Sequence, residues 1–299
     1  MPAILITGTS TGIGRATAEL LARNKYTVYA TMRAPERNPY LRQLAASENL
    51  PLTVLPLDVN DDASVASAME HILSKEKQLD VLINNAGIGA FGAVEELSME
   101  TIEQDMQTNY FGTVRCIKAV LPAMRERQAG CIINVTSIAG KLYSNFHSGY
   151  SASKAAVEAF SESLAQEVKP FKVQVAIVEP GVIDTPIFAK SNEMIRNKTN
   201  YPNIKRFMSM FAAALENHVS PMVVAEVILD IIEGRSTRFR NPAGPDAATL
   251  LNWRASTSDE EYINASLIDD ETWINVMEHA RGLAVRKYME SASIHQFDP

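Results

Sequence analysis

The chain has 299 residues, of which 46% are hydrophobic and 21% are charged, a size that suits one large domain or a domain with an elaboration. Its 28 basic and 35 acidic residues give a formal charge of -7 without a basic stripe, so we expect no nucleic-acid partner. No run of about 18 apolar residues occurs, so we expect no helix that spans a membrane.

The cysteines and histidines suggest neither a disulfide framework nor a metal site. Cys116 and Cys131 do not form a close-spaced pair, and the five histidines are scattered without the helical spacing of metal ligands. The N-terminal residues lack a basic leader and a cleavage site. These observations favour a cytoplasmic, reducing compartment and predict no bound metal.

Short apolar segments alternate with helical patterns along most of the chain. Strands are expected, in order, at Ala3–Thr7, Tyr26–Thr31, Leu52–Leu57, Leu79–Ile83, Cys131–Val135, Val173–Val178 and Thr237–Asn241. Helices are expected from near Gly12, over Asn38–Asn49, after a capping Asp61, over Met99–Arg127 with a break, over Gly149–Lys169 and over Pro221–Glu233. This alternation predicts an α/β fold: a Rossmann-type doubly wound parallel sheet of about seven strands with helices on both faces.

The pattern changes after Pro186. Residues 187–219 contain short helical signals and no strand, and Gly244-Pro245-Asp246 opens a helical tail in which Trp253 and Trp273 are expected to anchor the packing. We therefore expect one domain over residues 1–241 and a helical C-terminal extension over residues 242–299 that packs on the same domain.

One pair of side chains could carry acid–base chemistry. Tyr150 stands four residues before Lys154 in an expected helix, so the two side chains share one helix face. A phenol has an ordinary pKa of ~10, and a nearby ammonium favours the phenolate. The pair could exchange a proton with a hydroxyl or carbonyl, although such pairs also occur by chance in many helices.

The turn between the first strand and the first helix is rich in glycine. Glycines let a backbone bend and approach a phosphate, and a helix N-terminus near Gly12 offers N–H donors to a pyrophosphate. The spacing differs from the usual G-x-G-x-x-G, and an ordinary tight turn is the alternative. The candidate cofactor-binding residues in this turn are Gly8, Ser10, Thr11, Gly12, Ile13 and Gly14.

The end of the second strand distinguishes two cofactors. An acid at this place would hold the ribose hydroxyls of NAD, but Thr31-Met32-Arg33 has no acid before Glu36. Arg33 would instead bind the 2′-phosphate of NADP. NADP(H) is therefore favoured without excluding NAD(H), and a solvated surface arginine is the alternative.

Polar residues also follow the later strands, at the edge where open α/β sheets bind ligands. Asn85, in Asn84-Asn85-Ala86-Gly87, could reach an adenosine ribose, and Asp58 could accept from an adenine amine. Ser137 follows the fifth strand, where it could donate to a carbonyl oxygen. Asx turns and helix caps are the ordinary roles of such residues. Asn109 is a poor helix former inside a long helix and indicates a kink or a bound water.

Taken together, these segments resemble the short-chain dehydrogenase/reductase family in its compact single-domain branch. The resemblance covers about residues 3–240, and the motifs stand in the family's order. The stretch from Arg240 to Asp246 and the tail resemble members that are elaborated after the last strand. The matching motifs are Thr7-Gly8-x-x-x-Gly12-x-Gly14, Asp58-Val59, Asn84-Asn85-Ala86-Gly87, Asn109, Ser137, Tyr150-x-x-x-Lys154 and Pro180-Gly181-x-x-x-Thr185.

The resemblance implies a role for each of these residues. Tyr150 would be the general acid–base group, Lys154 would lower its pKa and bind the nicotinamide ribose, and Ser137 would polarise the substrate oxygen. Asn109 would hold a water that links Lys154 to solvent. Further cofactor contacts are implied for Asp58, Val59, Asn85, Ala86, Gly87, Pro180, Gly181, Ile183 and Thr185. Family members are commonly homodimers or homotetramers, and we expect the same of this chain.

The family's variable substrate-binding loop or cap corresponds to residues 187–219. Its apolar residues predict a hydrophobic alcohol or ketone as the substrate, although they could equally be the core of the cap. These residues are Ile187, Phe188, Met194, Phe207, Met208, Met210 and Phe211. The predicted function is an NAD(P)-dependent oxidoreductase. The alternatives are a catalytically inactive cofactor-binding sensor or scaffold, and an epimerase or dehydratase that reuses its cofactor.

Overall fold

A parallel sheet forms the centre of the molecule. The computed structural model describes residues 1–187 and 199–290, and within them the strand order is β3-β2-β1-β4-β5-β6-β7 with every neighbouring pair parallel. This arrangement confirms the predicted Rossmann-type sheet. The strands are β1 (Ala3–Ile6), β2 (Thr27–Met32), β3 (Leu52–Pro56), β4 (Val81–Asn84), β5 (Gly130–Val135), β6 (Val173–Pro180) and β7 (Arg240–Ala243).

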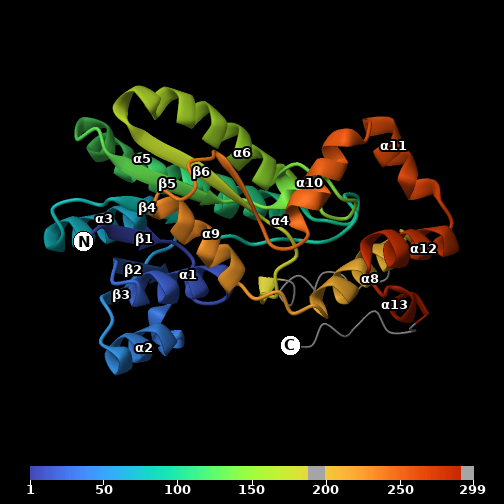
Figure 1. The fold of residues 1–299 in the computed structure, drawn as a ribbon, viewed down its shortest axis with the longest axis horizontal. Coiled ribbons are helices and arrows are strands. Elements are labelled where there is room, and N and C mark those ends of the chain that lie inside the picture. The colour runs from blue at the N-terminus through green and yellow to red at the C-terminus, as the bar shows by residue number, and fades with distance from the viewer. Residues whose placement is uncertain (188–198, 291–299) are drawn as a thin grey trace.

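Two layers of helices cover the sheet, as Figure 1 shows. One face packs against α1 (Gly12–Arg23), α2 (Tyr40–Glu48) and α9 (Met222–Ile232). The other packs against α3 (Asp62–Lys75), α5 (Gly112–Glu126) and α6 (Ser148–Val168). Because both faces are covered, the central strand β1 is apolar and buried at every position instead of alternating.

The long helix expected over Met99–Arg127 is interrupted, as predicted. α4 (Met99–Asp105) passes into a π-helical turn over Met106–Phe111 before α5 begins. Asn109 lies inside this turn and is almost fully buried. Single π-turns of this kind accommodate a residue whose side chain is needed elsewhere, and they are frequent at functional sites.

The C-terminal helices gather on one side of the molecule, apart from the sheet (Figure 1). They are α8 (Ile204–Leu215), α10 (Ala247–Ser256), α11 (Asp259–Asn264), α12 (Asp270–Arg281) and α13 (Arg286–Glu290). Trp273 packs with Ile274 and Met277 in a small core beside α8, so its role as an anchor is confirmed. Trp253 is 37% exposed, and its ring packs beside the ring of Tyr262 and under the guanidinium of Arg281, so it links α10 with α11 and α12 nearer the surface.

No helix in the described residues is long and apolar enough to cross a membrane. The last strand differs from its expected position, because β7 begins at Arg240 and not at Thr237. The side chain of Arg240, the first residue of this strand, lies between two buried carboxylates.

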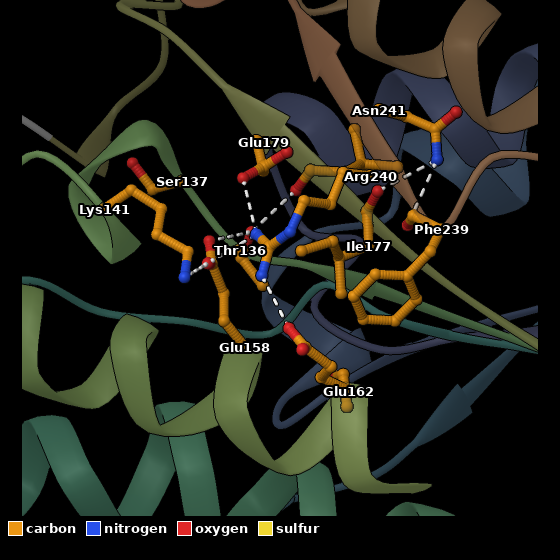
Figure 2. Close-up of polar contacts among 12 residues, drawn as sticks. Thr136, Ser137, Lys141, Glu158, Glu162, Ile177, Glu179, Phe239, Arg240 and Asn241 are labelled. Carbon is orange, nitrogen blue, oxygen red and sulfur yellow. Dashed lines mark hydrogen bonds and ion pairs between the residues drawn. The ribbon is translucent and has the colours of Figure 1, made fainter. Parts of the chain in front are cut away.

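Arg240 and its acidic partners form a network of ion pairs between α6 and the end of the sheet (Figure 2). Glu158 and Glu179 are only 1% and 2% exposed. Arg240 Nη1 lies 2.8 Å from Glu158 Oε2 and 3.0 Å from Glu179 Oε1, and its Nη2 lies 3.1 Å from Glu162. Burial and the charge of Glu158 raise the pKa of Glu179, which Arg240 opposes. One guanidinium therefore joins α6, β6 and β7.

Replacing Arg240 should destabilise the fold strongly. Arg240→Ala leaves Glu158 and Glu179 buried beside each other with only the half-exposed amine of Lys141 nearby, 3.8 Å from Glu158, and breaking a buried pair in this way costs about 3–5 kcal/mol. Urea unfolding at neutral pH measures the decrease in the free energy of unfolding. The matched control is Arg235→Ala, because Arg235 pairs with Asp230 on the surface and should cost less than about 1 kcal/mol. Equal losses in the two variants would contradict the role given to Arg240.

Candidate active site

The carboxyl ends of the strands meet at a topological switch point. β1 and β4 are neighbours, while the chain runs outward to β2 and β3 on one side and to β5 and β6 on the other. Open α/β sheets bind their ligands in the crevice at such a point. The motifs singled out in the sequence follow β1, β4, β5 and β6, so the fold brings them to this one edge.

The glycine turn after β1 packs tightly against the turn after β4. Gly8 and Gly12 have φ angles of +71° and +59°, which favour glycine. A Cβ on Gly8 would lie 2.6 Å from the Cα of Ala86, and one on Gly14 would lie 2.4 Å from the carbonyl oxygen of Gly8. Side chains at these positions would fill the space between the two turns, which we call the cradle.

Asn85 holds this cradle together from the side of β4. Its amide nitrogen donates to the carbonyl oxygens of Thr7 and Gly8 at 3.0 and 2.9 Å. In return, the Thr7 hydroxyl accepts from the backbone N–H groups of Asn85 and Ala86, both at 3.0 Å. The amide nitrogen that was expected to reach a ribose is therefore bonded inside the protein.

The cradle fits a dinucleotide. Thr11 precedes the first turn of α1 without capping it by its side chain, so this helix N-terminus keeps the donors and the dipole that bind a pyrophosphate. Arg33 is exposed directly after β2. Asp58 follows β3, where its carboxylate accepts from the N–H of Asn60 at 3.0 Å, which is the Asx turn weighed as its ordinary role.

Arg15 is a second arginine near the cradle, and the sequence patterns did not indicate it. The Arg15 guanidinium donates to the carbonyl oxygen of Ser10 at 3.1 Å through Nε, and it lies 4.8 Å from the ring centre of Tyr40. It therefore lies beside the glycine turn. The signal that could have found it is a basic residue in the first turn of the helix that follows the glycines.

Tyr150 and Lys154 occupy the first two turns of α6. Lys154 is 5% exposed, and its Nζ donates to the carbonyl oxygen of Val135 at 3.0 Å and lies 5.6 Å from the Tyr150 ring centre. A Cβ on Gly87 would lie 3.5 Å from this Nζ, so the turn after β4 passes close to the lysine. The structure thus brings Tyr150, Lys154 and Gly87 together.

Burial governs the protonation of both groups. It raises the pKa of Tyr150 to about 12, a change that the hydrogen bond with Ser137 opposes and the charge of Asp105 increases. Burial also lowers the pKa of Lys154 to about 8, which Asp105 and Glu158 oppose. Desolvation therefore outweighs the other influences on the pKa of Tyr150.

Asn109 uses its amide to shape the segment after β4. Its Oδ1 accepts from the N–H of Ile88 at 2.9 Å, and its Nδ2 donates to the carbonyl of Ile88 and to Ser153 Oγ, both at 2.8 Å. These bonds explain why a poor helix former lies in the π-turn. They also link that turn to α6 through Ser153.

The segment after β6 closes over the glycine turn. The Thr185 methyl group lies 3.2 Å from where a Cβ on Gly12 would stand, and Ile183 is buried. Asp246 accepts from the N–H of Val182 at 3.0 Å and occupies the space beside Gly181 that a side chain there would need. Pro180 and Gly181 therefore form a wall next to the cradle.

These residues open into one apolar cavity of about 1170 Å³. Ser137 and Tyr150 line it, together with Ile187, Phe207, Met210 and Phe211 of the expected cap. Met208 is instead buried in a small core with Phe91, Phe146 and Ile204. Phe188 and Met194, two of the predicted lining residues, lie outside the described part of the chain.

His147 is another residue that the sequence did not reveal. Its ring stacks on the Tyr150 ring with the centroids 4.5 Å apart and an angle of 10° between them. Burial lowers the pKa of His147 to about 3, so the imidazole is neutral at ordinary pH. Gly89 also lies close to this ring, because a Cβ on Gly89 would lie 3.0 Å from Cδ2 of Tyr150. The phenol is thus held between neighbours.

Comparison with known proteins shows the family. A model described as short chain dehydrogenase matches residues 2–196. The chain is 38% identical over 252 residues to 3-ketodihydrosphingosine reductase of Bacteroides thetaiotaomicron, which covers 83% of this chain and 90% of that one. It is 40% identical over 278 residues to retinol dehydrogenase 8 of Bos taurus, covering 88% of each.

A solved structure supports the same family assignment. A short-chain dehydrogenase from Streptomyces avermitilis is 31% identical and superposes with a TM-score of 0.74 over 94% of this chain and 97% of that one. The chain therefore belongs to the short-chain dehydrogenase/reductase family and is an oxidoreductase of the kind that interconverts CH–OH and C=O groups with a nicotinamide cofactor.

Asp105 is a buried carboxyl at the edge of this site, also missed in the sequence. It is 1% exposed, and its Oδ2 accepts from the N–H of Ala90 at 3.3 Å. The same oxygen lies 3.2 Å from where a Cβ on Gly149, the residue before Tyr150, would stand. Burial raises the pKa of Asp105 to about 6, while the Ala90 bond and the charge of Lys154 oppose this.

Asp105 should make the stability of the fold depend on pH. Its pKa in the folded protein lies above the ordinary value of 3.8, so protonation stabilises the fold at low pH and this contribution is lost as pH rises through about 6. Asp105→Asn stays neutral. Its free energy of unfolding relative to the wild type should therefore rise by about 2–3 kcal/mol between acidic and neutral pH.

Urea unfolding of both proteins across that pH range measures the difference. The control is Glu70→Gln, which changes an exposed carboxyl on α3 and should give the same difference from the wild type at every pH. A pH-independent difference for Asp105→Asn would refute the raised pKa.

Proposed function

We propose that the chain interconverts a ketone or aldehyde with an alcohol on a bulky apolar substrate and prefers NADP(H) as its cofactor. The observation that carries the proposal is the placement of Ser137 and Tyr150 on the wall of a large apolar cavity, with the buried amine of Lys154 behind the tyrosine. A hydrogen-bonding pair at an apolar wall can bind a carbonyl oxygen and exclude water around it.

The cofactor would lie along the carboxyl edge of the sheet. The turn of Gly8, Gly12 and Gly14 would hold the pyrophosphate, Arg33 the 2′-phosphate, and Thr185 with the Ile183 backbone the carboxamide. When bound, a nicotinamide supplies or accepts the hydride. Ile13, Pro180 and Gly181 line the same cavity as Tyr150, which is consistent with cofactor and substrate meeting there.

Proton transfer would fall to Tyr150. With a pKa of about 12 the phenol is protonated at neutral pH, so in reduction its Oη can give a proton to the carbonyl oxygen that Ser137 also contacts. Lys154 lies near the ring and would stabilise the phenolate that remains. In oxidation the same phenolate would take the proton from the alcohol.

The substrate is proposed to be large and apolar. The cavity of about 1170 Å³ includes the space that the nicotinamide would take, and away from the cofactor residues its wall is formed by large apolar side chains, among them Phe207, Met210 and Phe211. Two relatives carry names that refer to 3-ketodihydrosphingosine and to retinol. Those names agree with an apolar substrate for this chain and do not select one compound.

The two alternative functions are less well supported. An inactive sensor or scaffold has no need of Ser137 and Tyr150 on the wall of a cavity, nor of Lys154 beside the Tyr150 ring. An epimerase or dehydratase would show no net consumption of NADPH, and that measurement separates it from a reductase. Assembly as a homodimer or homotetramer and a cytoplasmic location stay predictions from the sequence.

Tyr150→Phe tests the proton donor. Removal of the hydroxyl leaves the ring between His147 and Gly89, so NADPH should bind within about twofold of the wild type while turnover falls by about 10³-fold or more. NADPH absorbance with a panel of hydrophobic ketones measures turnover, and fluorescence titration measures binding. Retained turnover would sink the assignment of Tyr150.

Arg33→Ala tests the cofactor preference. Loss of a charge-assisted bond to the 2′-phosphate should raise the KM for NADPH about 10- to 100-fold while the KM for NADH changes little. Arg37→Ala is the matched control, because Arg37 is a neighbouring exposed arginine whose nearest acid is Glu36 at 3.9 Å. If Arg33→Ala changed both Michaelis constants equally, the preference for NADP(H) would be wrong.

A further inference from the structure

One wall of the cavity comes from the C-terminal helices. Trp253 of α10, Tyr262 of α11 and Arg281 at the end of α12 line it, and we call these three residues the C-terminal wall. Ser137 and Tyr150 line the same cavity from the segments that follow β5. A ligand that fills the cavity would therefore contact both the carbonyl-binding pair and the C-terminal wall.

Arg281 is the residue of this wall whose charge indicates a ligand. Its guanidinium lies 4.3 Å from the ring centre of Trp253 and is partly buried. Among residues 1–187 and 199–290 it makes no hydrogen bond and no ion pair with a carboxylate. Burial lowers the pKa of Arg281, which shows that losing water is not offset by a neighbouring anion.

The other arginines of this region are neutralised. Arg206 also lines the cavity, but its Nε lies 2.6 Å from Asp270 and its Nη2 donates to the Ile268 carbonyl at 2.8 Å. Arg254 stacks on Tyr262 in the same way as Arg281 stacks on Trp253, yet it pairs with Asp259. Arg281 therefore differs from both in lacking an acidic partner within the described residues.

A carboxylate also lines the cavity. Asp246 lies beside Gly181, where its Oδ2 accepts from the backbone N–H of Val182 while its Oδ1 is buried without a hydrogen-bond partner among the described residues. A cationic or neutral head group at the C-terminal wall would leave Arg281 without a partner. A carboxylate would satisfy it, since a planar guanidinium binds a carboxylate through two parallel hydrogen bonds.

We propose that Arg281 binds the carboxylate of an amphipathic substrate, so that the substrate class is a long-chain oxo acid or the corresponding hydroxy acid. The inference rests on the proposed function, because the apolar chain would extend from Arg281 through the cavity to place its carbonyl at Ser137 and Tyr150. The Trp253 ring holds the guanidinium in place by a cation–π contact before the acid arrives.

Binding can be measured without any turnover. Dodecanoate and dodecanol differ in the head group, and their binding to the full chain can be followed by tryptophan fluorescence, since Trp253 lies in the wall. We expect dodecanoate to bind the wild type about 10- to 100-fold more tightly than dodecanol, as a charge-assisted bond in a partly buried site provides. Arg281→Met should reduce this ratio to near one, and Arg281→Lys should retain part of it.

Arg254→Met is the matched control. It removes an arginine that stacks on an aromatic ring of the same layer but does not line the cavity, so the ratio should stay at the wild-type value. A wild-type ratio near one, or equal losses in Arg281→Met and Arg254→Met, would overturn the inference. Far-ultraviolet circular dichroism of each variant checks that the comparison is made between folded proteins.

Turnover then separates this inference from the proposed function. NADPH consumption is compared for 12-oxooctadecanoic acid, its methyl ester and uncharged long-chain ketones. A higher kcat/KM for the acid than for the ester, lost in Arg281→Met, supports the inference. Reduction of ketones without an advantage for the acid overturns it and leaves the proposed function standing. If no carbonyl compound is reduced, the proposed function fails while the binding ratio still decides the role of Arg281.

Discussion

Arg240 binds two almost fully buried carboxylates, and through this contact it joins α6 to β6 and β7. Glu158 lies one helical turn after Lys154 on the same helix, and Glu179 is the penultimate residue of β6, before Pro180. The guanidinium therefore fixes the helix that carries Tyr150 against the strand that leads into the Gly181 wall (Figure 2). Buried pairs add little net stability compared with apolar packing, but they define one geometry, which a proton-transfer site requires.

The cofactor cradle depends instead on glycines, which have no side chain. Gly8 and Gly14 let the turn after β1 meet the turn after β4 at backbone distance, and Gly87 leaves room between Asn109 and Lys154. The amide of Asn85 then holds the two turns together. The cradle is thus built from main chain, which is common to sequences that differ widely in their other residues.

The sequence was sufficient to predict the sheet, its order of strands and helices, the break near Asn109 and the pair Tyr150 and Lys154. These features depend on local periodicity, on glycine turns and on motifs that are contiguous in the chain. It was not sufficient for His147, Asp105 or Arg281, because their environments are made by residues far away in the chain. The raised pKa of Tyr150 was missed for the same reason, since burial is a property of the assembled cavity. The bounds of β7 also differ from the prediction, which was Thr237–Asn241 where the strand runs over Arg240–Ala243.

The ring of Tyr150, packed against both His147 and the backbone of Gly89, also bears on the handedness of the product. These contacts hold the whole side chain in one place, so its hydroxyl oxygen occupies one point of the cavity wall and the entropy of placing it is lost on folding, before a substrate arrives. In the proposed reaction a prochiral ketone would present its oxygen to that one point. With a cofactor at the opposite wall, only one face of the carbonyl would be open to attack, and the alcohol would form as a single enantiomer.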